Sequence, residues 1–391
     1  MELTKKQEEG LRIAVERYKA KEKYTVISGY AGAGKTTLVK FIVKALNIPE
    51  ENLVYACFTG KAAQVLLKKG NKNVSTLHKL LYMSKPLRSG GYMHIPRDTL
   101  APYRVVIIDE CSMAPRKMIE LLLQYPVYVI FLGDPFQLPP IDKEDDNHLL
   151  DNPHVFLDEI MRQAKESEII QISMAIREGR PLPCFDGKDV KIFNKSDLSD
   201  GMLLWADQIL CAKNETRIAL NEKMRKLHGF EGLPVPGDKL IVLKNYWDNI
   251  STPSMDPLVN GTMGTIVDGY ADWFELPQTL WPDGVNTFRG EFVSDTGENF
   301  GELIMDYNLV TDNTKQLPWR VEYALLKAHL DELIPKEVTY GYAITVHKAQ
   351  GSQWDKVLVI EENFPFSREE HARWLYTAVT RAADKLVLIK K

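Results

Sequence analysis

The glycine-rich segment at residues 29–36 constrains the fold of this chain more than any other feature. Its sequence, GYAGAGKT, matches the pattern GxxxxGK[ST]. The apolar run at 24–28 has the length of a buried strand, and a helix is predicted from Thr36. A strand, such a loop and a helix together form a phosphate-binding loop. A plain glycine turn is the alternative, but the flanking elements argue against it. The sequence therefore predicts an α/β domain that binds a nucleotide.

The predicted loop gives its polar side chains specific roles. Glycines let backbone N–H groups turn toward the phosphates, and the N-terminus of the next helix adds positive potential. Lys35 is expected to reach the β- and γ-phosphates of ATP, and the Thr36 hydroxyl is expected to bind Mg²⁺. The residues predicted to bind nucleotide here are Gly29, Ala31, Gly32, Ala33, Gly34, Lys35, Thr36 and Thr37.

An acidic pair follows another apolar strand. Asp109 and Glu110 come directly after Val-Val-Ile-Ile at 105–108. Alone, such a pair is often only the start of a solvated loop. Downstream of a phosphate-binding loop, it is typical of an ATPase site. Asp109 is then predicted near Mg²⁺ through water, and Glu110 is predicted to orient or deprotonate the attacking water, so that Lys35 and Glu110 are both catalytic.

The remaining apolar runs predict more strands of the same kind. Runs at 53–57, 104–108 and 127–132 alternate with helical stretches, which is typical of βαβ units around a parallel sheet. Between the first two runs, residues 84–96 contain a Ser-Gly-Gly centre flanked by short runs and bounded by prolines. This pattern predicts a protruding β-hairpin.

The second half of the chain predicts a second α/β unit with an interruption. The unit begins near residue 191, and its closing strands are predicted at 356–360 and 385–389. Residues 246–334 interrupt it and are rich in aromatic and turn residues, which predicts a small inserted β domain.

Length and charge limit the classes of function. The chain has 391 residues, enough for two or three domains, and a net charge of −4. That charge argues against coating nucleic acid by bulk attraction, so a nucleic-acid track would have to be a local groove. The four cysteines form no CxxC pair, and no apolar run approaches the roughly 20 residues that span a bilayer. We expect a soluble, cytoplasmic protein without a membrane segment.

Two interpretations of Gln7 remain open from the residues alone. Thr4 and Gln7 have the spacing of a capping box, which would only start the first helix. The Gln7 amide could instead make a paired contact with adenine.

Taken in order, several segments resemble superfamily 1 helicases of the RecD-like and phage Dda-like branch with 5′-to-3′ polarity. The resemblance covers almost the whole chain. In that family an LTxxQ element recognises adenine, which favours Gln7 as a nucleotide-binding residue. The matching segments are LTKKQ at 3–7, GYAGAGKTT at 29–37, IIDECSM at 107–113, GDPFQLPP at 133–140, DEIMRQ at 158–163 and YTAVTRA at 376–382.

The resemblance also implies catalytic residues beyond the first ATPase core. Gln137 would sense the γ-phosphate and couple it to the DNA track. Arg162 and Arg381 would act as arginine fingers, whose guanidinium groups stabilise charge on the transferred phosphoryl group. Without the resemblance, the alternative for Gln137 is an ordinary loop residue after a strand. The alternative for Arg162 and Arg381 is a solvated position on a helix.

Further segments resemble DNA-contacting motifs, named Ia and V in the family. Small hydroxyl groups, backbone N–H groups and a few cations can hold a phosphate backbone without recognising its sequence. Ordinary loop residues are the alternative, and for Thr76 a helix cap. The family usually has Pro where this chain has Phe58, which leaves the local loop shape open. The predicted DNA-binding residues are Phe58, Thr59, Gly60, Lys61, Thr76, His78, Tyr92, Met93, Thr345, His347, Lys348, Gln350 and Ser352.

The implied architecture is two RecA-like P-loop NTPase domains with a β-hairpin pin and a small SH3-like β insertion. Tyr92 and Met93 would form the wedge of the pin, and a plain surface hairpin is the alternative. The predicted limits are 1–150 for the first RecA-like domain with its hairpin at 84–96, 151–190 for a connecting segment, 191–245 plus 335–391 for the second RecA-like domain, and 246–334 for the insertion.

The resemblance implies an ATP-dependent 5′-to-3′ DNA helicase for replication or repair, acting as a monomer on single-stranded DNA and duplex junctions. Single-strand-binding or replisome proteins are expected partners. If the chain is viral, we expect it to act in the cytoplasm of the host. A translocase that displaces proteins with little unwinding fits the same motifs. A P-loop kinase or signalling NTPase leaves Gln137, Arg162, His347 and Arg381 unused. Intact Glu110 argues against a subunit that only binds nucleotide.

Overall fold

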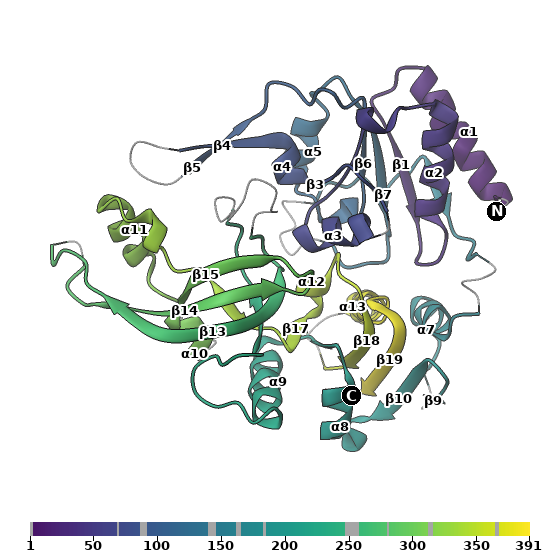
Figure 1. Cartoon of the computed structure of the whole chain (residues 1–391). Helices are drawn as coiled ribbons and strands as arrows, with labels where there is room; N and C mark the ends of the chain where they lie inside the picture. The colour runs from purple at the N-terminus through teal and green to yellow at the C-terminus, as the bar shows by residue number, and fades with distance from the viewer. Residues whose placement is uncertain are drawn as a thin grey trace. The chain divides into compact units, whose positions relative to one another are not determined.

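The computed structural model describes residues 3–68, 70–86, 92–139, 146–161, 166–182, 185–246, 258–279, 281–311, 316–363 and 367–391. Two compact units make up the chain. The first comprises 1–82, 96–212 and 346–391, and the second comprises 83–95 and 213–345. Figure 1 labels most of the helices and strands of the two units. No helix of the described ranges is long and apolar enough to cross a membrane.

A six-stranded parallel sheet organises the N-terminal part of the first unit. Its order is β3-β2-β6-β7-β1-β8, so β7 lies between the strand before the glycine-rich loop and the strand before the acidic pair. The carboxyl ends of parallel strands meet at one edge, which brings those loops together. The strands are β1 (Tyr24–Gly29), β2 (Leu53–Cys57), β3 (Val74–Thr76), β6 (Val105–Ile108), β7 (Tyr128–Gly133) and β8 (Val155–Leu157).

Helices cover both faces of this sheet because its strands are apolar on both sides. Val106 and Ile108 pack into one core with α4 and α5, whereas Val105 and Ile107 pack into another with α1 and α2. This burial explains why the strands are continuous apolar runs. The helices are α1 (Lys5–Lys19), α2 (Lys35–Leu46), α3 (Gly60–Lys68), α4 (Leu77–Leu81) and α5 (Arg116–Leu122).

A second sheet completes the first unit. Strands β11, β18, β19 and β10 are parallel neighbours in that order, and β9 joins β10 in the antiparallel sense. Helices α7 and α13 pack against each other and on β19. The elements are α7 (Glu168–Arg177), β9 (Phe185–Asp186), β10 (Val190–Asn194), α8 (Asp200–Trp205), β11 (Gln208–Cys211), α12 (Val346–Ala349), β18 (Trp354–Ile360), α13 (Arg368–Val379) and β19 (Ala382–Lys390).

The second unit is built mainly from antiparallel strands. A sheet of order β15-β14-β13-β12-β16 forms its centre, and α11 packs on the outer part of β13 and β14 through a separate small core. The elements are β4 (Tyr82–Pro86) and β5 (Tyr92–Pro96), which form a two-stranded sheet, then α9 (Asn214–Leu227), β12 (Lys239–Val242), β13 (Met263–Phe274), β14 (Val285–Ser294), β15 (Asn299–Asp306), α10 (Tyr307–Thr311), α11 (Trp319–Lys327), β16 (Val338–Tyr340) and β17 (Ala343–Thr345).

These elements confirm the predicted mixed α/β class with parallel sheets. Strands β4 and β5 lie within and beside the predicted hairpin at 84–96, while residues 87–91 between them lie outside the described residues. Strands β13, β14 and β15 lie within the segment 246–334 that was predicted to be rich in β structure.

Candidate active site

The glycine-rich loop connects β1 to α2 and needs glycine at two positions. Gly32 and Gly34 have φ angles of 78° and 79°, in the left-handed region that glycine adopts readily. A Cβ at Gly34 would also lie 2.4 Å from Gln7 Nε2. Lys35 begins α2, and its ammonium group donates to the carbonyls of Gly29 at 2.6 Å and Tyr30 at 3.1 Å. The lysine is thus folded back over its own loop.

Gln7 is buried and joins α1 to this loop. The capping box is present: the Gln7 N–H donates to Thr4 Oγ1 at 3.3 Å, and the Thr4 N–H donates to Gln7 Oε1 at 3.0 Å. The Gln7 amide Nε2 donates to the Ala33 carbonyl at 3.3 Å. The side chain therefore caps a helix and lies against the predicted nucleotide loop at once. Adenine recognition by Gln7 stays a prediction.

Asp109 and Glu110 follow β6 as predicted. The Glu110 N–H donates to Asp109 Oδ1 at 3.0 Å, and Glu110 has a φ of 50°. A positive φ is uncommon for a residue other than glycine and is often found at functional sites. After this backbone turn, the Glu110 carboxylate contacts Arg381 of the C-terminal segment.

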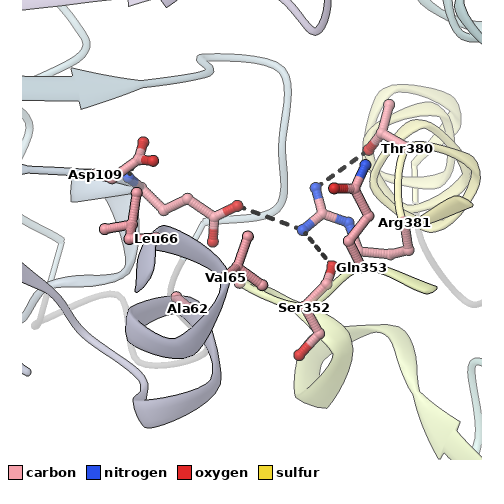
Figure 2. Close-up of a pocket in the computed structure, with 10 residues that line it drawn as sticks. Ala62, Val65, Leu66, Asp109, Ser352, Gln353, Thr380 and Arg381 are labelled. Carbon is pink, nitrogen blue, oxygen red and sulfur yellow. Dashed lines mark hydrogen bonds and ion pairs between the residues drawn. The ribbon is translucent and has the colours of Figure 1, made fainter. Parts of the chain in front are cut away.

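Arg381 comes from the end of α13 and meets Glu110 in a small pocket (Figure 2). Its Nη1 donates to Glu110 Oε1 at 3.3 Å and to the Ser352 carbonyl at 3.3 Å. Its Nη2 donates to Thr380 Oγ1 at 3.3 Å. The pocket has a volume of about 170 Å³ and is also lined by Asp109. Arg381 is therefore held in a fixed orientation beside the predicted catalytic carboxylate.

The surroundings of Glu110 change its acidity. Burial raises the pKa of Glu110 above the ordinary value, and the nearby charges of Arg381 and Lys35 oppose this rise. Glu110 Oε2 is buried and has no hydrogen-bond partner among the residues that the structure describes. A buried carboxylate oxygen without a partner, facing a pocket, suits a group that accepts a proton from a bound water.

The loop after β7 is held by α13. Asp134 Oδ1 accepts from the Phe136 N–H, and Oδ2 accepts from the Tyr376 hydroxyl at 2.7 Å. The Leu138 N–H donates to Thr377 Oγ1 at 2.9 Å. Gln137 lies in this loop, half-buried, and its N–H donates to the Asp134 carbonyl at 3.3 Å. A sensor role for Gln137 stays a prediction, but its loop is bound directly to the helix that precedes Arg381.

The predicted motif Ia residues lie at the start of α3. Thr59 Oγ1 accepts from the Ala62 N–H at 3.2 Å, and Gly60 is the first residue of the helix. The Lys61 ammonium lies 4.2 Å from the centre of the Trp354 ring. This cation–π contact ties α3 to β18, so the lysine has a structural partner as well as its predicted DNA role.

Three further predicted DNA contacts cluster around α4. Thr76 is the N-cap of α4, and its Oγ1 accepts from the Lys79 N–H at 3.2 Å, so the capping alternative is present. The rings of Phe58 and His78 are 5.6 Å apart, and His78 also contacts Tyr82. The aromatic Phe58, where the family usually has Pro, is thus part of a short stack.

The predicted motif V residues follow β17. Thr345 ends that strand, and His347 and Lys348 lie in α12. Burial lowers the pKa of His347, which favours its neutral form. Gln350 is buried and its Nε2 donates to the Leu138 carbonyl at 2.8 Å.

Gly351 closes this segment against α3. Its φ is 74°, and a Cβ there would lie 2.8 Å from Thr59 Oγ1 and 3.2 Å from Glu110 Oε2. The backbone of the predicted motif V thus approaches both motif Ia and the acidic pair.

For three predicted residues the structure describes no side-chain contact. Arg162 lies outside the described residues. Tyr92 and Met93 lie in β5 of the hairpin. The predictions missed Tyr376, Thr377 and Asp134, all of which bind the loop after β7, and Arg177, whose guanidinium stacks 3.7 Å from the centre of the Tyr30 ring. Asp134, Tyr376 and Thr377 carried a signal, since all three fall inside segments that resemble the family, whereas Arg177 falls outside them.

Comparison with known proteins agrees with this arrangement. An AAA domain family model matches residues 2–195, and a model of the UvrD-like helicase C-terminal domain matches residues 340–389. The ATP-dependent RecD2 DNA helicase of Deinococcus radiodurans is 28% identical over 94% of this chain and 47% of its own length. The helicase Dda of Enterobacteria phage T4 is 33% identical over 36% of this chain and 34% of its own length. The sequence of this chain is therefore similar to those of the RecD2 and Dda helicases.

This relationship extends to an uncharacterised relative and to solved structures. A mimivirus protein, R530, is 24% identical over 92% of this chain and 93% of its own length. A Bacteroides Pif1 helicase, solved with ADP-AlF3 and single-stranded DNA, aligns with a TM-score of 0.53 at 18% identity over 99% of this chain and 92% of that one. This likeness shows a shared fold. The chain spans about half the length of RecD2 and a third of that of Dda.

Proposed function

We propose that this chain is an ATP-dependent 5′-to-3′ DNA helicase that moves along single-stranded DNA and separates duplex. The observation that carries the proposal is the contact of Arg381, from the C-terminal segment, with Glu110 of the acidic pair. In this arrangement an arginine from another part of the fold reaches the ATPase carboxylate. Nucleotide turnover can then change how the segment that carries the arginine packs against the nucleotide site. The similarity to RecD2 and Dda supports DNA as the track.

The residues divide the chemistry among them. Glu110 accepts a proton from, or orients, the attacking water, because its Oε2 is buried and available. Lys35 leaves the carbonyls of Gly29 and Tyr30 to bind the β- and γ-phosphates. Arg381 turns from Glu110 to the γ-phosphate, where its charge is most needed as negative charge develops.

Mg²⁺ fits the donors present at this site. Thr36 in the first turn of α2 offers a hydroxyl oxygen, and Asp109 after β6 offers carboxylate oxygens, which are the hard ligands that Mg²⁺ prefers. These two residues would hold the ion, and its charge would neutralise phosphate oxygens when bound.

The DNA track follows from the predicted motif Ia and motif V segments, with RecA-like domains on both sides of the nucleotide. Thr59, Lys61 and Gln350 belong to those segments. The Lys61 contact links α3 to β18, and the Gln350 contact links motif V to the loop after β7. The hairpin β4–β5 is proposed as the pin that divides the strands, and the β-rich segment at 246–334 as an SH3-like insertion.

The decisive experiment measures ATP hydrolysis with and without single-stranded oligonucleotide, then unwinding of duplexes with 5′ or 3′ overhangs. A helicase of this polarity shows DNA-stimulated hydrolysis and opens only 5′-overhang substrates. Hydrolysis indifferent to DNA would contradict the proposal. Stimulated hydrolysis without opening of bare duplex would instead identify a translocase that displaces proteins.

Further expectations concern the setting of the protein. We propose that it acts as a monomer on single-stranded DNA and duplex junctions in the cytoplasm, or in the host cytoplasm if viral, with single-strand-binding or replisome proteins as partners. Sedimentation of the chain alone and with a forked oligonucleotide tests whether it is a monomer and whether it binds a duplex junction.

A further inference from the structure

The Tyr376 hydroxyl joins two loops of the nucleotide site. It accepts from the Ala31 N–H of the glycine-rich loop at 2.8 Å and donates to Asp134 Oδ2, in the loop after β7, at 2.7 Å. The three groups come from three separate segments of the chain, 345 and 242 residues apart from Tyr376 to its two partners. A single hydroxyl thus satisfies one donor and one acceptor from different loops.

The environment keeps this hydroxyl in place. Tyr376 is 1% exposed, and its ring makes an edge contact with Phe136 at 5.2 Å. Burial raises the pKa of Tyr376 far above the ordinary range, so the hydroxyl keeps its proton for Asp134. Without the hydroxyl, the N–H of the half-buried Ala31 and an oxygen of the buried Asp134 carboxylate would lose their partner, which is costly.

A continuous series of contacts leads from Tyr376 to a predicted DNA-binding residue. The next residue, Thr377, accepts from the Leu138 N–H through its Oγ1. The Leu138 carbonyl in turn accepts from Gln350 Nε2 at 2.8 Å. Ala31 at one end belongs to the predicted nucleotide loop, and Gln350 at the other belongs to the predicted motif V.

We propose that Tyr376 is a positioning residue that couples the occupancy of the nucleotide loop to the DNA grip of motif V. A nucleotide that shifts the Ala31 N–H changes the hold of Tyr376 on Asp134, and α13 passes that change to Leu138 and Gln350. The inference rests on the proposed function, because it needs a chain that binds both ATP and single-stranded DNA. The hydroxyl touches neither ligand and acts through the two loops.

The test is Tyr376→Phe, which keeps the packed ring and removes only the hydroxyl. The affinity for a labelled single-stranded oligonucleotide is measured without nucleotide and with a non-hydrolysable ATP analogue. In the wild-type chain the two affinities differ, and in Y376F their ratio falls by about fivefold or more toward unity. The nucleotide-free affinity stays the same, which distinguishes lost coupling from a damaged DNA site.

A matched control is Tyr128→Phe, which removes another buried hydroxyl, bonded to Thr25 and Ala14 on the side of the sheet that α1 covers. It should keep the wild-type ratio. Asp134→Asn removes the acceptor of the Tyr376 hydroxyl, keeps an oxygen for the Phe136 N–H, and should reduce the ratio as Y376F does. If Y376F fails to fold, the ratio of DNA affinities measured for D134N tests the proposal instead.

A wild-type ratio in both Y376F and D134N would overturn the coupling role. Failure of the proposed function is recognised separately, because the unmodified chain would then show no DNA stimulation of hydrolysis and no nucleotide dependence of DNA binding, which also removes the inference.

Discussion

Arg381 and Glu110 are 271 residues apart in the sequence, yet their side chains form an ion pair of 3.3 Å in a small pocket. The carboxylate belongs to the loop after β6, and the guanidinium belongs to a residue between α13 and β19. The pair holds the proposed arginine finger and the proposed base against each other. Arg381 therefore lowers the pKa of Glu110, and the contact holds the two side chains in a fixed orientation.

Replacing Arg381 should change the pH dependence of hydrolysis. Burial raises the pKa of Glu110, and Arg381 lowers it, so Arg381→Gln should raise that pKa further. The base works as a carboxylate, so the rate falls as pH drops through this pKa, and the acid limb should move to higher pH in the variant. We also expect turnover to fall by about 10³-fold or more. Single-turnover hydrolysis across pH measures both effects.

Arg368→Gln provides the control for Arg381. This arginine is exposed at the other end of α13 and should leave the pH profile unchanged. An R381Q profile with its acid limb at the wild-type position would show that Glu110 is not the titrating base.

Replacing Lys35 should abolish hydrolysis without unfolding the chain. Lys35→Ala removes the cation for the phosphates, and a loss of about 10²- to 10³-fold or more is expected. Its two contacts to loop carbonyls are hydrogen bonds worth about 1 kcal/mol each to stability, so thermal unfolding should change little. Lys40→Ala, at an exposed position on the same helix, is the control. Substantial hydrolysis by K35A would refute the nucleotide site.

Two substitutions separate the roles of Gln7. Thr4→Ala removes the cap and should cost about 1 kcal/mol of stability while leaving the preference for ATP over GTP intact. Gln7→Ala removes the Gln7 half of the capping box together with the amide that lies against the nucleotide loop. This substitution should weaken the preference for ATP over GTP. Hydrolysis of both nucleotides and thermal unfolding are measured for each variant. Equal preference in wild type and Q7A would leave Gln7 as a helix cap alone.

Tyr92→Ala tests the proposed pin. Separating duplex costs about 1.4 kcal/mol of stacking per base-pair step, so a wedge residue should affect unwinding more than hydrolysis. We expect slower strand separation by Y92A with nearly normal DNA-stimulated hydrolysis. Tyr270→Ala, an exposed tyrosine on β13, serves as the control. Equal loss of both activities in Y92A would discard the pin.

Local sequence patterns predicted the elements that depend on nearby residues. The apolar runs became the parallel strands because each residue is buried on one face or the other. The helix predicted from Thr36 is α2, which begins one residue earlier at Lys35, since the phosphate-binding loop marks its start locally. The phosphate-binding loop and the acidic pair were predictable because glycine and strand ends mark them locally.

Contacts between distant segments were not predictable in the same way. Nothing near Tyr376 in the sequence indicates that its hydroxyl bonds to Ala31 and Asp134, since the three meet only when β1, β7 and α13 are assembled. The contact of Lys61 with Trp354 is of the same kind, because a lysine predicted to bind phosphate also lies on an indole from β18. Short strands such as β12 and β17 carry too few residues for a periodic signal.

The geometry at Gly351 limits how this chain can vary. With a φ of 74° and Thr59, Ala62 and Glu110 around it, position 351 has neither the backbone freedom nor the space for a side chain. Gly229 and Gly232 have similar φ angles but open space around them. In a saturation library selected for activity, asparagine and aspartate should therefore persist at 229 and 232, while 351 should retain glycine alone. Recovery of active variants with larger residues at 351 would mean that α3 yields more readily than its packing suggests.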